Sequence, residues 1–517
     1  MSSMSSSHCS PNYPSPILCH LLAAPNITGA EILFHSGVEV TNYTLPSGNP
    51  TSFCNVTVSV THPGADDIVY STILLPSPPS RWNTRYLATG GGGFAAGSGD
   101  RDLLEPVSQG WVASSTDGGL TLNNTLDPQT GAWAIRPNGS YNEDLVINLV
   151  YRSIHDTAEL SKALINQFYG QELSHSYYSG CSAGGRQGYA SAANYPSDFD
   201  GILATAPALG APEFVVAAYW PAIVMRETET PPYCVFEAYK AAILEHCDPL
   251  DGVADGLISD PDLLASCAFD TSVLVGEEIP CSQLGAQSST VITSAHAEIV
   301  RRILEGPVTP EGKKLWHGLA PGVSFSGAAS TTTLANGTSV IVPFRHSEPW
   351  IKYLTYRDQS YDPTTIDYET FLETFNLSVS RMSSLYGNSV LNLTNFARGG
   401  GKLLTWYGLA DDAIPPLGMV DFRHQVERDL GGEEAVNEWY RLFFAPGVAH
   451  CRGGYGPSPV DPLKALVDWV EGGEAPETLF ARGVNDGEDI TRDLCVFPKR
   501  LVYAGGDVRE ASSFVCG

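Results

Sequence analysis

Basic residues are scarce in this sequence. It has 29 lysines and arginines against 57 aspartates and glutamates, which gives a formal net charge of −28 over 517 residues. Nucleic acids and anionic membrane surfaces bind to clusters of basic side chains, and the sequence shows no such cluster. It also has no apolar run as long as a membrane span. We therefore expect neither nucleic acid nor a membrane as a partner, and the sequence leaves the oligomeric state open.

A recognisable secretory leader is also missing, because the first residues have neither a charged start nor an apolar core. The 11 cysteines and several glycosylation sequons nevertheless indicate an oxidising compartment. We expect a secreted glycoprotein whose start is truncated or mispredicted, or whose export is unconventional. The sequons begin at Asn26, Asn42, Asn55, Asn123, Asn138, Asn336, Asn376 and Asn392.

The most informative stretch is a G-x-S-x-G motif centred on Ser182. In this motif a strand turns sharply into a helix and exposes the serine hydroxyl at the apex. The glycines at 180 and 184 leave room for such a turn, and strand formers precede it while helix formers follow it. Ser182 is therefore the candidate nucleophile. A chance glycine–serine loop is the alternative, because the pattern is short.

A run of glycines, residues 90–93, follows a predicted strand at 85–89. Lipases and esterases form half of an oxyanion hole from a backbone N–H at such a place, and the other half from the residue after the nucleophile. The candidate donors are Ala183, Gly92 and Gly93, and the sequence does not decide which glycine donates. The alternative is a flexible loop.

The order of predicted elements favours an α/β-hydrolase core with a large insertion. A helix is predicted over 142–169 with Gly170 as its left-handed cap, and core strands are predicted at 198–207 and 401–408. Between them the chain loses its strand–helix rhythm. We therefore expect a catalytic domain made of residues 1–210 and 396–517, with residues 211–395 as an inserted lid.

Two residues late in the chain complete a candidate triad with the serine. In α/β hydrolases the acid follows a late strand and the histidine lies in a final loop, which fits Asp411 and His450. Asp412 is the neighbouring rival, and a simple turn is the alternative for both aspartates. Cys181 precedes the serine and Cys451 follows the histidine, so a bond between these cysteines would hold both residues as neighbours.

A second group of residues has the chemistry of a calcium site. Asp248, Asp251 and Asp255 lie close together among glycines, and hard oxygen donors at this density suit Ca²⁺. The spacing is not that of an EF-hand. The alternative is a solvated acidic turn in an acidic protein.

Together these motifs resemble the tannase and feruloyl esterase family of fungal and bacterial serine esterases. The match rests on Cys181-Ser182, Asp411 and His450-Cys451, and it runs from about residue 19 to residue 516. The glycine run resembles the oxyanion loop of the family, and residues 248–257 resemble its lid calcium motif. The resemblance implies that the Asp248, Asp251 and Asp255 carboxylates hold a structural Ca²⁺ together with the carbonyls of Val253 and Leu257.

The resemblance also implies a set of disulfides, although this chain lacks the extra lid cysteine pair that the family often has. Cys9 is left without a partner. Besides Cys181–Cys451, the implied pairs are Cys19–Cys54, Cys234–Cys281, Cys247–Cys267 and Cys495–Cys516.

The function that the resemblance implies is the hydrolysis of phenolic acid esters through an acyl-enzyme. Hydroxycinnamoyl esters, such as feruloyl esters of plant cell walls, are slightly favoured over the galloyl esters cleaved by tannases. An intracellular esterase of fungal secondary metabolism and a catalytically inactive binding protein are the other hypotheses. The intact set of Ser182, Asp411 and His450 argues against the inactive protein.

Overall fold

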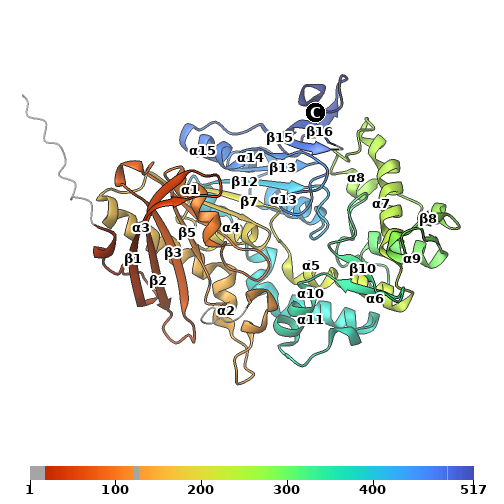
Figure 1. Cartoon of the computed structure of the whole chain (residues 1–517), viewed down its shortest axis with the longest axis horizontal. Helices are drawn as coiled ribbons and strands as arrows, with labels where there is room; N and C mark the ends of the chain where they lie inside the picture. The colour runs from red at the N-terminus through yellow and green to blue at the C-terminus, as the bar shows by residue number, and fades with distance from the viewer. Residues whose placement is uncertain (1–17, 122–126, 486) are drawn as a thin grey trace, which may run out of the picture.

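The computed structural model describes residues 18–121, 127–485 and 487–517, so Cys9 and the sequon at Asn123 lie outside the described residues. Its centre is a nine-stranded sheet (Figure 1). In spatial order the strands are β1 (Glu31–Thr44), β2 (Pro50–Thr61), β3 (Val69–Pro76), β5 (Val112–Thr116), β4 (Arg85–Thr89), β6 (His175–Cys181), β7 (Gly201–Thr205), β12 (Lys402–Gly408) and β13 (Tyr440–Ala445).

The sheet is antiparallel at one side and parallel at the other. The pairs β1–β2, β2–β3 and β3–β5 are antiparallel, whereas all pairs from β5 to β13 are parallel. Parallel neighbours end at the same edge, and ligands bind at the carboxyl ends of such strands. The loops after β4, β6, β12 and β13 therefore meet at one edge of the sheet.

Helices cover both faces of the parallel part, because successive strand side chains point to opposite faces. In β4, Tyr86 and Ala88 belong to the large core cluster beneath α3 (Ser153–Tyr169) and α4 (Ala183–Asn194). Leu87 points the other way, into the cluster that includes Leu466 and Trp469 of α15 (Pro462–Gly472). Helix α1 (Asp100–Ser108) covers β3 and β5. Two covered faces explain why nearly every residue of β4, β5, β7 and β12 is buried.

The predicted helix over 142–169 is present but is not α-helical throughout. It consists of α2 (Glu143–Ile147), a π-helical turn over Asn148–Arg152 and α3, and it ends at Gly170 in the left-handed conformation. In the π turn, the Asn148 carbonyl accepts the Ser153 hydroxyl at 2.7 Å and the Leu149 carbonyl accepts Gln187 Nε2 at 2.7 Å. Side-chain partners of this kind depend on tertiary contacts, so the helical spacing could not reveal the turn.

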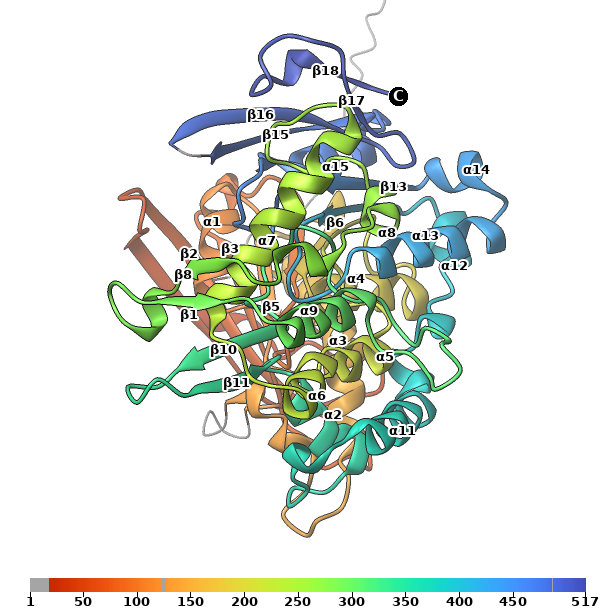
Figure 2. The ribbon, with the colours of Figure 1, turned by 90° about the vertical axis from the view of Figure 1, so that its right-hand side faces the viewer.

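A long insertion lies between β7 and β12 and is drawn from yellow-green to cyan in Figures 1 and 2. The expected lid boundaries at 211 and 395 stay a prediction. Residue 395 falls inside helix α12 (Thr394–Arg398). The helices of the insertion are α5 (Ala211–Ala217), α6 (Trp220–Glu227), α7 (Tyr233–Cys247), α8 (Leu263–Ser266), α9 (Ser294–Glu305), α10 (Ser347–Pro349), α11 (Tyr368–Tyr386) and α12 (Thr394–Arg398), and its hairpins are β8 (Glu278–Pro280) with β9 (Ser289–Val291) and β10 (Ala329–Thr333) with β11 (Ser339–Pro343). None of the described helices is long and apolar enough to cross a membrane.

After β13 the chain adds a small region that the sequence analysis did not predict. It contains α15 and a three-stranded sheet of β14 (Ser458–Pro459), β15 (Thr478–Asn485) and β16 (Glu488–Cys495), followed by the pair β17 (Leu501–Tyr503) and β18 (Phe514–Cys516). Helices α13 (Leu417–Asp429) and α14 (Glu433–Asn437) connect β12 to β13. Figure 1 shows the C-terminal strands beyond the β13 edge of the large sheet.

A buried charged histidine ties the antiparallel strands to α3. His62 Nδ1 lies 2.7 Å from Asp67 Oδ2, and its Nε2 lies 2.9 Å from Asp156 Oδ2. Burial alone would lower the pKa of this imidazole, but the hydrogen bonds to Asp156 and Asp67 outweigh burial and raise the pKa to about 9. The imidazolium hydrogen-bonded to these two carboxylates keeps the pKa of the Asp67 carboxyl well below its usual range.

We predict that this network makes stability fall in alkaline solution. Because the pKa of His62 in the folded state lies above its ordinary value of 6.5, protonation of His62 stabilises the fold. This contribution is complete below pH 6.5 and is lost as the pH rises through 9. Between pH 7 and 10 the wild type should therefore lose roughly 2 kcal/mol more of its free energy of unfolding than His62→Gln. Denaturant titrations at each pH measure this loss. His35→Gln is the matched control, because among the described residues that ring bonds only the carbonyl of Leu22. Parallel pH profiles for the wild type and His62→Gln would refute the prediction.

Candidate active site

The G-x-S-x-G motif forms the predicted turn between a strand and a helix. Strand β6 ends at Cys181, Ser182 has φ 62° and ψ −123°, and α4 begins at Ala183. A positive φ is strained for serine, so the surrounding structure must hold it there. The Ser182 N–H donates to the Thr205 carbonyl at 3.0 Å, and the Ser182 carbonyl accepts the Ala208 N–H at 3.0 Å. These backbone bonds fix the serine at the carboxyl edge of the sheet.

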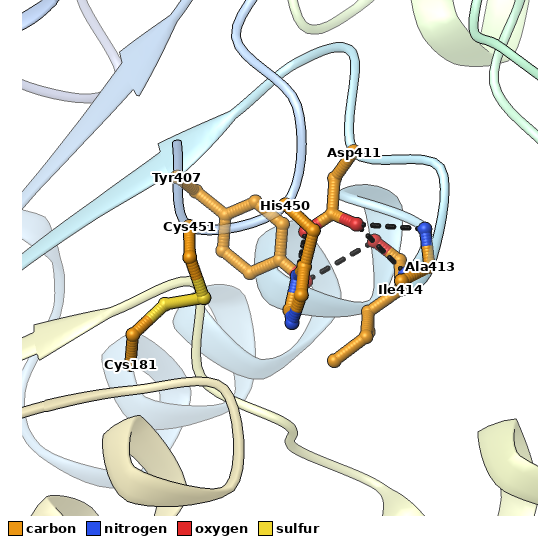
Figure 3. The surroundings of a disulfide bond; sticks show 7 residues. All are labelled: Cys181, Tyr407, Asp411, Ala413, Ile414, His450 and Cys451. Carbon is orange, nitrogen blue, oxygen red and sulfur yellow. Dashed lines mark hydrogen bonds and ion pairs between the residues drawn. A yellow bond between two sulfur atoms is a disulfide. The ribbon is translucent and has the colours of Figure 1, made fainter. Parts of the chain in front are cut away.

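The candidate acid and base lie next to each other after β12 and β13. Asp411 is fully buried, and its Oδ2 is 2.7 Å from His450 Nδ1 (Figure 3). The other oxygen, Oδ1, accepts the N–H groups of Ala413 and Ile414, each at 2.9 Å. The Tyr407 hydroxyl donates to the Ile414 carbonyl at 3.2 Å and so supports the same turn. The Asp411 carboxylate is therefore held in one orientation toward the histidine.

The rival aspartate has a different partner. Asp412 Oδ2 accepts a hydrogen bond from the hydroxyl of Ser326 in the insertion at 3.0 Å, and burial raises the pKa of the Asp412 carboxyl.

For His450, burial alone would lower the pKa of the imidazole, but the charge of Asp411 and its hydrogen bond outweigh burial and raise the pKa. This geometry is that of a histidine oriented and charge-stabilised by Asp411.

A disulfide joins the serine turn to the histidine loop. Cys181 and Cys451 are bonded, with their Cα atoms 6.0 Å apart, across 270 positions of sequence (Figure 3). Cys451 has φ 64°, so the histidine loop is also held in a strained conformation. The structure contains the other four pairs named from the sequence as well: Cys19–Cys54, Cys234–Cys281, Cys247–Cys267 and Cys495–Cys516.

The glycine loop after β4 lies against the first turn of α4. The Gly184 N–H donates to the Gly91 carbonyl at 2.9 Å, and a Cβ on Gly184 would lie 2.5 Å from that oxygen. The Gly91 N–H is already used, because it donates to Gln187 Oε1 at 3.2 Å. In the described part of the protein, the N–H groups of Gly92, Gly93 and Ala183 have no hydrogen-bond acceptor. These three groups remain available to an oxyanion, and Gly91 does not.

Sequence reasoning missed the residue that ties this loop to the helix. Gln187 is buried one turn after the serine, and its Nε2 donates to the carbonyls of Ala96 at 3.0 Å and Leu149 at 2.7 Å. Together with the bond from Gly91, these contacts join α4, the glycine loop and the π turn. The position of Gln187 on the nucleophile helix was the available signal, but a lone glutamine has no distinctive spacing.

A cavity of about 850 Å³ opens at this edge of the sheet. Ser182, His450 and the glycine loop line one part of it, and the insertion supplies much of the rest. Its apolar and aromatic lining includes Phe94, Phe214, Val215, Trp350 and Tyr386. Phe94 and Trp350 are stacked with their ring centroids 6.5 Å apart. The cavity can therefore hold a planar aromatic group beside the serine.

The acidic loop of the insertion is half-buried and satisfied by its own backbone. Asp251 accepts the N–H of Ser259 at 2.7 Å, and Asp248 accepts that of Gly256 at 2.8 Å. Asp255 forms an ion pair with the buried Arg492 of β16 at 2.5 Å. Burial, assisted by the charges of Asp255 and Asp248, raises the pKa of Asp251 to about 7. Among the described residues no three His, Cys, Asp or Glu side chains lie close enough together to enclose a metal ion.

We predict different effects of removing the charge from the two neighbouring aspartates. Asp411→Asn should lower turnover on the order of 10⁴-fold, by analogy with the same change in a serine protease triad, because the imidazole loses its orienting carboxylate. Asp412→Asn should change turnover less than about tenfold, because its carboxylate bonds Ser326. Steady-state kinetics on methyl ferulate, with thermal melts as the folding control, measure both. The reverse ranking would assign the acid to Asp412.

Comparison with known proteins finds one matching family and relatives named feruloyl esterase. The family described as tannase and feruloyl esterase matches residues 54–517. A probable feruloyl esterase from Arthroderma benhamiae is 40% identical over 512 residues, covering 96% of this chain and 93% of the relative. A probable feruloyl esterase B-2 from Aspergillus fumigatus is 29% identical, covering 92% and 90%.

Solved structures agree in fold and confirm the predicted α/β-hydrolase architecture. The tannin acyl hydrolase from Aspergillus niger has a TM-score of 0.85 at 26% identity, covering 96% of this chain and 93% of that one. Feruloyl esterase B from Aspergillus oryzae has a TM-score of 0.78 at 25% identity, covering 96% and 99%. With its geometry and these matches over nearly its whole length, the chain belongs to the tannase and feruloyl esterase family of carboxylic ester hydrolases.

Proposed function

We propose that this protein hydrolyses phenolic acid esters, hydroxycinnamoyl esters in particular, through a covalent acyl-enzyme on Ser182. The observation that carries the proposal is that His450, hydrogen-bonded to the buried Asp411, lines the same cavity as Ser182. The relatives named feruloyl esterase support the substrate class. The aromatic walls of the cavity suit a phenolic acyl group.

In the proposed reaction each of these groups has one role. Ser182 Oγ attacks the ester carbonyl carbon while His450 Nε2 takes the hydroxyl proton, and Asp411 stabilises the imidazolium. The N–H of Ala183 and one of the two glycine N–H groups, Gly92 or Gly93, donate to the oxyanion. His450 then gives the proton to the leaving alcohol. A water molecule, deprotonated by His450, attacks the acyl-enzyme and releases the acid and free Ser182.

Two neighbouring activities remain candidates. A tannase acting on galloyl esters is supported by the similarity to the Aspergillus niger tannin acyl hydrolase. An esterase of secondary metabolism would use the same catalytic residues on a different ester. Both differ from the proposal in the ring and alcohol that the cavity accepts, so a substrate panel separates them.

We also propose that the protein is secreted and glycosylated. Five disulfides support an oxidising compartment. The sequon asparagines at 26, 42, 138, 336, 376 and 392 are exposed, whereas Asn55 is half-buried in β2 with its Oδ1 unbonded. Intact-mass analysis of secreted protein before and after deglycosylation tests this proposal.

We predict that Ser182→Ala abolishes ester hydrolysis without loss of the fold. Turnover of methyl ferulate should fall at least 10³-fold, because no other group can form the acyl-enzyme, while the thermal midpoint stays within a few degrees. Mass spectrometry of the quenched wild type should find an acyl adduct on the peptide containing Ser182. Retention of more than about a hundredth of the activity would show that Ser182 is not the nucleophile.

The substrate panel is run on the same preparations. Methyl ferulate and methyl caffeate should exceed methyl gallate in kcat/KM, and simple alkyl esters should be the poorest. A preference for methyl gallate would favour the tannase function. A preference for alkyl esters would contradict a phenolic acyl group.

We further propose that the acidic loop holds a structural Ca²⁺. Asp248, Asp251 and Asp255 bring three carboxylates to a half-buried loop, and among the described residues only Arg492 forms an ion pair with them. The net negative charge and the oxygen-only donor set therefore fit a divalent ion. The carbonyls of Val253 and Leu257 would add to these ligands, and the loop must contract to enclose the ion. Bound Ca²⁺ would neutralise the carboxylates and stabilise the insertion.

We predict that calcium removal destabilises the protein more at high pH. Without the ion, the pKa of Asp251 lies above its usual 3.8, so the folded state loses stability as the pH rises through 7. Protein stripped of Ca²⁺ with EGTA at pH 8 and then exchanged into each buffer should have a thermal midpoint about 2–5 °C below that of the Ca²⁺-loaded protein at pH 8, and the difference should be smaller at pH 5. Calorimetric titration of Ca²⁺ into the stripped protein should detect one site in the wild type and none in Asp251→Asn. An equal midpoint with and without chelator at pH 8 would contradict the site.

A further inference from the structure

The cavity differs in charge from the rest of this acidic protein. Three arginines line it, at 186, 345 and 452, against two aspartates, at 102 and 412. The whole chain has about two acidic residues for each basic one. An excess of positive charge in one hollow of a strongly negative protein concentrates anionic ligands there.

The two outer arginines have no carboxylate partner in the described part of the protein. Arg345 is exposed, and it donates only to neutral groups, Gln129 Oε1 at 3.3 Å and His346 Nε2 at 3.2 Å. The pKa of His346 is lowered to about 4 by burial and by the charge of Arg345, so this imidazole is neutral. Arg452 is also exposed, and its side chain makes no hydrogen bond or ion pair with another described residue. Both guanidinium groups are therefore free to bind a ligand.

The position of these arginines indicates which part of an ester they would meet. The walls beside Ser182 that suit an aromatic acyl group, Trp350 and Tyr386, are buried. An exposed side chain that lines the same cavity must lie toward its mouth. Arg452 is also two residues after His450, whose Nε2 must reach the leaving oxygen. With the aromatic acyl group against the buried walls, the alcohol part of the ester would point toward the mouth of the cavity, where the exposed arginines lie.

The acidic residues of the cavity do not cancel this charge. Asp412 is bonded to Ser326, and burial raises its pKa. Asp102 belongs to α1 and is exposed to solvent, where its field is screened. The third arginine of the cavity, Arg186, is buried and donates to the carbonyls of Leu385 and Tyr386, so Arg345 and Arg452 are the two arginines exposed to an anion in solution.

We propose that the mouth of the cavity recognises a carboxylate on the alcohol part of the ester, bound by Arg345 and Arg452. This inference rests on the proposed function, because it assigns the substrate class of the same site. The preferred substrates are then phenolic esters of hydroxy acids rather than of neutral alcohols. Guanidinium groups suit this role because their N–H donors match the two oxygens of a carboxylate.

The test compares two esters that differ only in charge, feruloyl glycolate and feruloyl glycolamide. The wild type should cleave the glycolate with about tenfold higher kcat/KM at low ionic strength, mostly through KM. The preference should shrink in 0.5 M NaCl, because salt screens exposed charges. An exposed ion pair contributes about 2–5-fold in binding. Arg345→Gln and Arg452→Gln should therefore each lower the ratio of kcat/KM for the glycolate to kcat/KM for the glycolamide by that factor.

Conservative and remote variants complete the design. Arg345→Lys keeps the charge and should retain most of the preference, whereas the double glutamine variant should bring the ratio near one. Arg398→Gln is the matched control, because Arg398 is exposed, does not line the cavity and forms no ion pair with another described residue. It should leave the ratio unchanged.

The outcomes separate this inference from the proposed function. Cleavage of both esters at equal rates by the wild type, or a ratio insensitive to both glutamine variants, would overturn the inference and leave the esterase function intact. No cleavage of either ester or of methyl ferulate would overturn the proposed function itself. The ratio is measured within each preparation, so partial unfolding of a variant does not change its meaning.

Discussion

The Cys181–Cys451 disulfide is the constraint on which the arrangement of the site depends. It joins the residue before Ser182 to the residue after His450, across 270 positions of sequence. Both loops are strained, since Ser182 and Cys451 have positive φ, and a covalent bond between them limits how far either can relax. Small displacements of reacting groups cost much in rate, so such a bond supports preorganisation more directly than added packing would.

The parallel part of the sheet provides the frame for this constraint. Strands β4, β6, β12 and β13 end at one edge, and each supplies one part of the site: the glycine loop, Ser182, Asp411 and His450. The insertion then closes the space above that edge with aromatic side chains. The core thus positions Ser182, Asp411 and His450, and we propose that the insertion and the two exposed arginines select the ester.

Several buried charges of this protein are paired, whereas in the described part of the chain the buried Arg186 of the cavity wall bonds only the carbonyls of Tyr386 and Leu385. His62 has two carboxylates, and the fully buried Arg492 joins the C-terminal sheet to the acidic loop through Asp255. Removing one partner of such a pair leaves an uncompensated buried charge. Against this background the exposed guanidinium groups of Arg345 and Arg452 stand out, because neither has a carboxylate partner among the described residues.

Sequence alone determined what depends on local chemistry and chain order. The Gly-x-Ser-x-Gly turn, the glycine run after a strand, and the order of Ser182, Asp411 and His450 were legible because each has a steric or topological reason at short range. The cysteines beside Ser182 and His450 suggested a bond for the same reason. The core strands and Gly170 were also predictable from alternation and capping.

Only the tertiary structure decided the features that depend on distant partners. The choice of Asp411 over Asp412 as the partner of His450 comes from the hydrogen bonds each makes, and adjacent residues have no spacing to distinguish them. Gln187 and the π turn hold the oxyanion loop through contacts 38 and 96 residues apart. The arginines of the cavity mouth come from the insertion and from the last loop of the core. Their convergence is a property of the fold, which no periodicity in the sequence records.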